Sequence, residues 1–423
     1  MLTHRIMKAF DPMTTGILKT VGAPLRYKLW RPIHACLIMG DVIALGAPNE
    51  QDHERHLRAA IDWLCLAQDV RNSKPDAGGV SAGWSFEDGW LPSYPETSGY
   101  IVETFLAAAS ILNRPDLIAR AHRIIDWELS IQHADGAFPG HFGEPGSHPV
   151  IFNTGQIMHG MLAGYLQLGR PECLESAVKA GQWLVRHQDP DGCWRKFEHN
   201  GVPHAYNTRG TWALLATALI IGDRALKAGA VRNLDWALTQ QRESGWFANN
   251  AFVPARDPFT HTIAYCIRGL LESGVLLGEA RYLDAAARAA QAVAKVQRRD
   301  GWLAGTYGPA WQPSAAYCCL TGVAQMSINW TRLAQAAGLE QLRSNSRSAL
   351  LFLKRSQRMT NGDPTVIGAI AGSLPIWGGY SRFEFPNWAA KFFADALMMD
   401  LKDTAVPPIS RNDSRRTQET ASV

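Results

Sequence analysis

No apolar run in this 423-residue chain is long enough to span a bilayer, although 46% of the residues are hydrophobic. A net charge of +4, without a basic stripe interleaved with aromatic residues, gives no indication of nucleic-acid binding. The seven cysteines are odd in number and show neither disulfide nor metal-ligand spacing. We therefore expect free thiols in a reducing compartment, no metal site and no cofactor.

The two ends of the chain are predicted to lie outside the main domain. Residues 1–50 lack the pattern of a secretory signal peptide, because the apolar stretch from Ala35 to Leu45 is interrupted by Asp41. This absence predicts a cytoplasmic protein. The basic, aromatic segment from Lys19 to Arg31 predicts an arm that packs on the domain. The alternative is peripheral contact with an anionic membrane surface, such as the inner membrane. The polar tail, residues 401–423, is predicted to be disordered.

A pattern is repeated six times between these ends. An amphipathic helix ends in glutamine, a glycine-containing turn follows, and a second helix begins at a polar cluster. The closing glutamines are 53 to 64 residues apart, at Gln68, Gln132, Gln188, Gln241, Gln297 and Gln357. Repeats of this length are supersecondary units that bury their apolar faces on one another. The sequence therefore predicts an all-α fold, an (α/α)6 toroid of six helical hairpins over residues 51–400.

The first helix of each hairpin is predicted to have a structural role. An apolar and usually large residue precedes each glutamine by five positions, as Trp183 precedes Gln188. We expect the aromatic residues to fill the wedge between hairpins and the glutamines to bond backbone groups of the neighbouring repeat.

The second helices are predicted to form an inner ring. Five are expected to begin at a capping threonine and the sixth at Asn387. The threonines are Thr97, Thr154, Thr208, Thr262 and Thr321. Because hairpin repeats keep their direction, all six N-termini should face one rim, and their dipoles favour an anionic ligand there.

At this rim the sequences of the six repeats differ from one another, as we expect of positions that contact a ligand. Carboxylates, imidazoles and phenols are candidates for moving protons. The candidate catalytic residues are Glu96, Tyr206, His261, Tyr265 and Glu384. Aromatic rings, amides and a guanidinium suit a sugar with a carboxylate. The candidate substrate-binding residues are Tyr94, Asn153, Gln156, His204, Asn207, Arg209, Asn387 and Trp388.

The repeats, clearest in residues 177–194, resemble those of terpenoid cyclases such as squalene–hopene cyclase and of protein prenyltransferase β-subunits. The ring also resembles six-hairpin carbohydrate enzymes: N-acylglucosamine 2-epimerases, unsaturated glucuronyl hydrolases, (α/α) polysaccharide lyases and glucuronyl C5-epimerases. Stretches such as Pro203–Arg209 and Pro386–Asp395 look like a bacterial family often encoded among exopolysaccharide genes. The chain lacks the Asp-x-Asp-Asp cluster of alkene-protonating cyclases. Its Asp191-Gly-Cys193 segment has the spacing of a prenyltransferase zinc site but lies on a scaffold turn.

These observations favour a carbohydrate-active enzyme of exopolysaccharide biosynthesis or modification. It would perform acid–base chemistry on a glycan that contains uronic acid, as an epimerase, a lyase or a glycoside hydrolase. One alternative is an isoprenoid-handling enzyme, which predicts a cavity walled by aromatic rings with few polar groups. The other is a non-catalytic glycan-binding assembly protein, which predicts no closely apposed acid–base pair.

Overall fold

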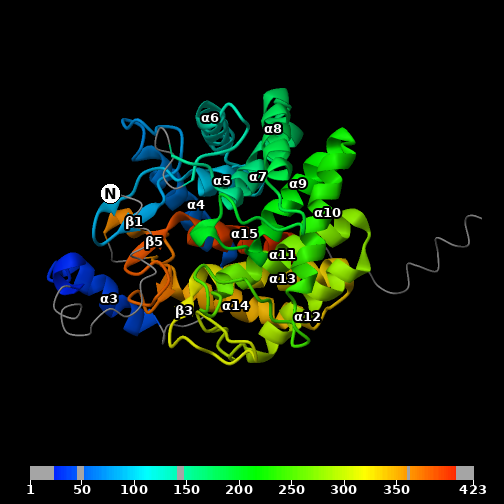
Figure 1. Ribbon diagram of the computed structural model, residues 1–423. Coiled ribbons are helices and arrows are strands. Elements are labelled where there is room, and N and C mark those ends of the chain that lie inside the picture. Colours follow the sequence, from blue (N-terminus) through cyan, green and yellow to red (C-terminus); the bar gives the residue numbers. More distant parts are fainter. Residues whose placement is uncertain (1–22, 45–51, 141–146, 360–362, 406–423) are drawn as a thin grey trace, which may run out of the picture.

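The computed structural model describes residues 23–44, 52–140, 147–359 and 363–405. Helices occupy 61% of the chain, and the fold is the predicted (α/α)6 toroid (Figure 1). None of the helices in these ranges has the length and hydropathy needed to cross a bilayer.

Six outer helices and six inner helices alternate along the chain. The outer helices are amphipathic and bury one face, as α8 does with Ala177, Ala180 and Trp183. They are α4 (His53–Asp69), α6 (Asp116–Ile131), α8 (Pro171–Arg186), α10 (Arg224–Thr239), α12 (Ala280–Val296) and α14 (Leu342–Ser356). The inner helices are apolar on nearly all sides and are buried along most of their length. They are α5 (Pro95–Ile111), α7 (Ile151–Leu168), α9 (Thr208–Ile221), α11 (Thr260–Leu277), α13 (Leu320–Ala337) and α15 (Asn387–Ala405).

The repeated glutamines hold neighbouring hairpins together, as predicted. Each side-chain amide donates one hydrogen bond to a glycine carbonyl in its own turn and one to a backbone carbonyl of the next outer helix. Gln188 Nε2 lies 2.9 Å from the carbonyl oxygens of both Gly192 and Gly229. Gln357 of the sixth hairpin bonds the carbonyl of His56 in α4 at 3.1 Å. The same device therefore closes the ring.

A glycine is required in these turns for two reasons. Gly192 has a φ of 95°, and a Cβ atom there would lie 2.3 Å from the carbonyl oxygen of Arg232. Gly301 repeats both features, with a φ of 91° and Ser348 O at 2.1 Å. The turn must therefore be left-handed and must pass directly under the next outer helix.

The prediction of threonine caps was wrong. Helices α5, α7, α11 and α13 begin one to three residues before their threonines, and no side chain caps any of the five helix starts concerned. The threonines bond other groups instead: the Thr154 hydroxyl accepts from Phe138 N, and the Thr208 hydroxyl donates to Cys266 O. At four of these starts, α5, α7, α11 and α13, the chain enters the helix from an extended residue before the threonine, such as Val150 before α7.

Short strands and an N-terminal helix cover the rim where the inner helices begin. One sheet has the order β2 (Gly89–Trp90), β1 (Gly83–Ser85), β5 (Glu384–Pro386), and a second pairs β3 (Cys318–Cys319) with β4 (Ser373–Leu374). Helix α3 (Pro32–Ala44) lies beside β1 and β5 (Figure 1). The predicted arm is described only from residue 23. Helix α15 continues to Ala405, past the predicted boundary at residue 400, and the rest of the predicted tail lies outside the described residues.

Candidate functional site

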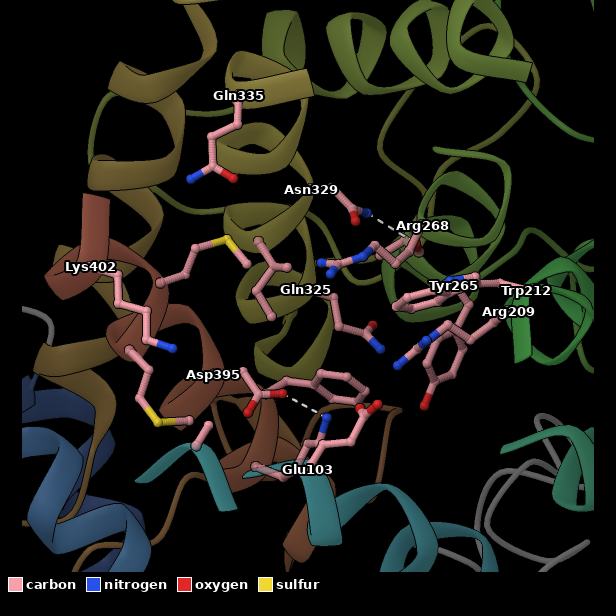
Figure 2. A pocket seen from close by; sticks show the side chains of 17 residues that line it. Glu103, Arg209, Trp212, Tyr265, Arg268, Gln325, Asn329, Gln335, Asp395 and Lys402 are labelled. Carbon is pink, nitrogen blue, oxygen red and sulfur yellow. Dashed lines mark hydrogen bonds and ion pairs between the residues drawn. The ribbon is translucent and has the colours of Figure 1, made fainter. Parts of the chain in front are cut away.

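A cavity of ≈ 340 Å³ lies between the inner helices (Figure 2). It extends from the first turns of α9 and α11, at Arg209 and Tyr265, to the last turns of α13 and α15, at Gln335 and Lys402. Gln335 and Lys402 are exposed, whereas Arg209 and Tyr265 are buried. The cavity therefore opens toward the end of the toroid where the inner helices finish.

The lining of the cavity is polar and carries more positive than negative charge. Four cationic side chains face two carboxylates, together with three amides, the ring of Trp212 and the apolar side chains of α13 and α15. The cations are Arg209, Arg268, Lys391 and Lys402; the carboxylates are Glu103 and Asp395; the amides are Gln325, Asn329 and Gln335.

Two of these cations are paired with carboxylates. Lys391 Nζ lies 2.6 Å from Asp395 Oδ2, and Arg268 Nε lies 3.0 Å from Glu272 Oε1. Arg209 differs. Its guanidinium, in a side chain that is only 5% exposed, contacts the neutral ring of His159 and lies 4.6 Å above Trp212. Among the described residues, no carboxylate lies within 4 Å of it. A buried cation that is not paired with a carboxylate favours the binding of an anionic ligand.

His159 links Arg209 to Glu103. Burial, and then the charge of Arg209, hold the pKa of His159 well below its ordinary value, so the ring is neutral. The Arg209 guanidinium lies 2.8 Å from His159 Nε2, which accepts when the ring proton is on Nδ1; the other tautomer, protonated on Nε2, donates to the Arg209 carbonyl oxygen at 3.0 Å. In the first tautomer the proton is on Nδ1. That proton then faces Glu103 Oε1, 4.0 Å away.

Of the predicted site residues, Arg209 and Tyr265 line this cavity. Above them, toward the rim, lies an aromatic layer. Phe152 contacts both Tyr206 and Tyr265, with ring centroids 5.0 and 5.2 Å apart, and the His261 ring lies 4.4 Å from Tyr265. These rings belong to residues at or just before the starts of α7, α9 and α11, the rim at which the sequence placed the ligand.

Glu96 lies within this upper part. It accepts a hydrogen bond from Tyr94 Oη at 2.9 Å, and burial raises its pKa to about 7. His261 is also buried, and desolvation lowers its pKa to about 3, although its Nδ1 lies 2.9 Å from Gln325 Oε1. Several buried polar atoms here have no hydrogen-bond partner among the described residues: Asn153 Nδ2, Gln156 Oε1 and Nε2, Tyr265 Oη and Gln325 Nε2.

The remaining candidates make structural contacts. Asn387 donates to Ser81 O and Thr97 Oγ1, both at 2.8 Å, and Trp388 donates to Tyr380 Oη. Asn207 donates to Glu198, and His204 is stacked on Tyr206 with its Nε2 2.9 Å from His199 O, where a neutral ring protonated on Nε2 donates. Burial lowers the pKa of His204 to about 4.

Glu384 is separate from the cavity. It lies in β5 opposite Ser85 of β1, and burial, followed by the nearby charge of Glu87, raises its pKa to about 7. The structure therefore does not bring Glu384 and Glu96 together at the cavity as a hydrolytic pair.

Sequence reasoning missed most of the cavity lining. Glu103, His159, Arg268 and Asp395 each lie eight residues after the first residue of their inner helix. Ile328 of α13 has the same position, and Ala216 of α9 does as well. This ring of positions diverges among the repeats as the rim does. Comparing equivalent positions two turns inside each helix would have revealed it.

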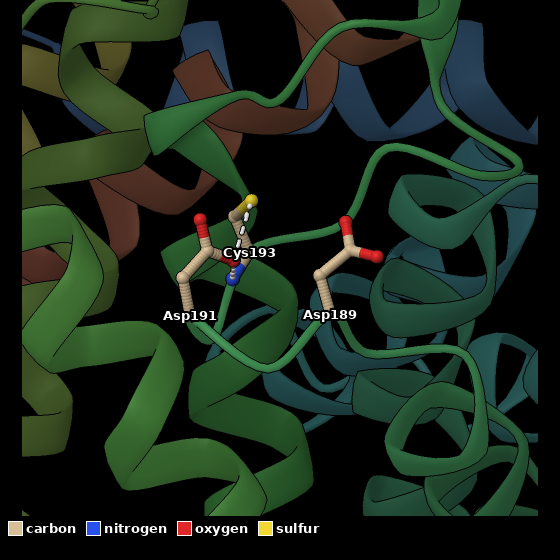
Figure 3. Close-up of side chains that lie close together, drawn as sticks. All are labelled: Asp189, Asp191 and Cys193. Carbon is tan, nitrogen blue, oxygen red and sulfur yellow. Dashed lines mark hydrogen bonds between the residues drawn. The ribbon is translucent and has the colours of Figure 1, made fainter.

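The turn that follows α8 brings Asp189, Asp191 and Cys193 close together (Figure 3). Arg195 pairs with both carboxylates, at 3.0 and 2.7 Å. The Cys193 thiol donates to Asp191 at 3.2 Å, and burial raises its pKa to about 12. Both carboxylates are therefore already paired with an arginine, and we assign this cluster to the scaffold.

Comparisons with known proteins agree on the fold. Residues 92–271 match the family model of the squalene–hopene cyclase C-terminal domain. No curated protein matches the sequence. The unsaturated glucuronyl hydrolase from Bacillus sp. GL1 superposes with a TM-score of 0.61 at 15% identity, over 81% of this chain and 96% of that one. The cellobiose 2-epimerase from Bacillus thermoamylovorans gives 0.66 at 12%, over 83% and 98%. The fold is thus shared with glycoside hydrolases and sugar epimerases.

Proposed function

We propose that this protein is a carbohydrate-active enzyme of exopolysaccharide biosynthesis or modification. It binds a glycan that contains uronic acid in the cavity between its inner helices and performs acid–base chemistry there. The observation that carries this proposal is the Arg209 guanidinium, which is buried at the inner end of the cavity and has no carboxylate partner in the described part of the chain. A planar guanidinium matches a carboxylate through two parallel hydrogen bonds.

The rest of the lining suits a sugar. Tyr265 and Trp212, the latter with the guanidiniums of Arg209 and Arg268 over its ring, contribute aromatic surface for a pyranose, and Gln325 and Asn329 offer polar groups to its hydroxyls. The volume of ≈ 340 Å³ lies at the lower end of the usual range for small-ligand pockets, which fits one or two sugar units. Among the comparison structures, one unsaturated glucuronyl hydrolase is described as complexed with dGlcA-GalNAc6S, a sugar that carries a uronic acid.

The chemistry follows from the groups around a carboxylate held by Arg209. Glu103 accepts the proton on the carbon next to that carboxylate, and the electron pair of the broken C–H bond moves into the carboxylate, where Arg209 stabilises the added charge. Burial raises the pKa of Tyr265, so its hydroxyl keeps its proton and can donate it. Return of a proton to the opposite face of the carbon completes an epimerisation. Loss of the neighbouring oxygen substituent completes an elimination.

Two variants and a control test this proposal. Uronic-acid oligosaccharides are incubated with the enzyme in heavy water, and deuterium at the carbon and the unsaturated product are both followed. We expect Glu103→Gln to lower the rate at least about 100-fold, as loss of a general base does. We expect Arg209→Lys to weaken binding, because a point charge cannot replace the planar fork.

Glu340→Gln is the matched control, because Glu340 is exposed on the outer surface and should leave the rate unchanged. Full activity of Glu103→Gln would contradict the assignment of the base. Turnover of neutral sugars with no exchange in any uronate would contradict the proposed substrate.

One observation favours an isoprenoid-handling enzyme as a second candidate. Burial raises the pKa of Glu96 to about 7, so its carboxyl holds a proton up to near neutrality, and burial likewise raises the pKa values of Tyr100, Tyr206 and Tyr380, with a smaller contribution from the Glu96 charge. An acid among aromatic rings could protonate an alkene. If Glu96→Gln abolishes turnover of a polyprenyl substrate while Glu103→Gln does not, this second candidate is correct.

A further inference from the structure

Five of the exposed large hydrophobic side chains belong to the N-terminal segment and to the loop that packs on it. Leu25, Trp30 and Met39 are 66%, 63% and 57% exposed. Ile367 and Trp377, between α14 and α15, are 41% and 40% exposed. We call these five residues the arm surface. The two exposed tryptophans are notable because tryptophan side chains are on average largely buried in folded proteins.

The arm surface is held firmly by the opposite side of the same segment. His34, Leu37 and Asp41 of α3 are buried, at spacings of three and four residues, whereas Met39 lies on the other side of the helix. Asp41 pairs with Arg358 and accepts a hydrogen bond from Ile376 N at 2.6 Å, directly beside Trp377. Arg26 pairs with Glu87 at 2.7 Å. The apolar side chains are therefore presented outward by an anchored element.

Positive charge is concentrated in the same part of the chain. Residues 1–40 contain six Lys and Arg and one Asp, a net charge of +5, so the remaining 383 residues carry −1 to give the total of +4. Four acidic groups lie on the elements near the arm: Glu87, Asp88, Asp363 and Glu384. Glu87 is engaged by Arg26 and, through its carbonyl, by Lys28. Arg31, which follows Trp30 in sequence, and Arg382, which lies over the rings of Tyr27 and Phe383, are exposed.

We infer that the arm surface binds the headgroup region of an anionic lipid bilayer. Tryptophan side chains are enriched at membrane interfaces because one end of the ring is apolar and the other can hydrogen-bond, and neighbouring cations are attracted by acidic lipids. The combination of apolar side chains with a basic segment matches such a surface in charge as well as in hydropathy.

This placement also orients the enzyme. The arm packs against residues around β1, β4 and β5, just before α5 and α15 begin, whereas the cavity opens where α13 and α15 finish. A bilayer bound at the arm surface would therefore leave the cavity mouth facing the aqueous phase, free to take up a hydrophilic glycan.

Vesicle sedimentation of the full-length protein tests the inference. Vesicles of phosphatidylcholine with 30% phosphatidylglycerol are compared with vesicles of phosphatidylcholine alone. We expect binding to the anionic vesicles that weakens as salt rises. The double variant Trp30→Ser, Met39→Ser should reduce this binding at least about tenfold, and Arg31→Glu, which removes no packing, should reduce it as well.

The control is Leu219→Ser, Ile220→Ser, which removes two exposed apolar side chains at the opposite end of the toroid and should change nothing. Circular dichroism and thermal unfolding show whether each variant is folded. Equal binding to neutral vesicles, absence of binding by the wild type, or equal loss in the control would overturn the inference. So would an arm-dependent dimer in light scattering without vesicles, because the surface would then bind a second copy.

Discussion

At the scale of single residues, burial sets the protonation state of the groups around the cavity. Glu96 and His261 are both desolvated, and the effect is opposite in sign: the pKa of the carboxyl rises to about 7, and that of the imidazole falls to about 3. Both groups therefore favour the neutral form. Charge is retained where a partner or a ligand can balance it, as at Lys391 beside Asp395.

Replacing Glu96 by glutamine should stabilise the protein at high pH. A carboxyl whose pKa is raised from 4.5 to about 7 on folding contributes stability that is fully present below pH 4.5 and is lost as pH rises to about 7. Above that pH the buried carboxylate costs roughly 3 kcal/mol, which glutamine avoids. Denaturant unfolding of both proteins at pH 5 and pH 8.5 measures the difference. A gain that is the same at both pH values would show that the carboxyl is not the cause.

The sequence indicated part of the site for a clear physical reason. Arg209 and Tyr265 lie within two turns of a helix start, in the part of each repeat whose sequence differs from the others. Glu103 and His159 lie deeper, inside apolar helices. A single polar residue in such a helix is usually interpreted as a buried group whose hydrogen bonds are made within the core. Only the packing of the consecutive inner helices α5, α7 and α9 on one another makes them neighbours of Arg209.

At the scale of elements, the glutamine–glycine pair and the apolar, usually large residue five positions before the glutamine make one joint between hairpins. Trp183 is fully buried, and its Nε1 donates to Asp135 of the preceding turn at 3.1 Å. These features were readable from the sequence because they recur in every repeat. The sequence predicted the starts of α9 and α15 at Thr208 and Asn387, and the other four inner helices begin one to three residues before the predicted threonines, because residues that differ from repeat to repeat form their first turns.

Trp183→Ala should lower the free energy of unfolding by about 3–5 kcal/mol, since it removes a buried indole and leaves a cavity between α8 and its neighbours. Trp377→Ala, at a tryptophan that is 40% exposed, should cost much less. Denaturant unfolding followed by circular dichroism compares the two. Folded Trp183→Ala protein should keep its activity, and a selective loss of activity at unchanged stability would show that Trp183 belongs to the site.

At the scale of the whole molecule, closure of the ring creates both the stability and the site. Gln357 and His56 are 301 residues apart in sequence and join the sixth hairpin to the first. The same closure gathers residues from five inner helices around one cavity. Because all inner helices share one direction, the sequence predicted the ring. It did not predict a cavity that extends to the end of the toroid where α13 and α15 finish.

The central claim is that the cavity holds an anionic sugar by its carboxylate, and an experimental structure of the protein with a glucuronic-acid disaccharide tests it most directly. The account predicts that the sugar lies between α5, α9, α11, α13 and α15, with its carboxylate bonded to Arg209 and a ring face on Trp212 or Tyr265. A disaccharide bound only at the rim, beyond the aromatic layer, would contradict the account, as would a cavity that takes up a polyprenyl chain and excludes the sugar.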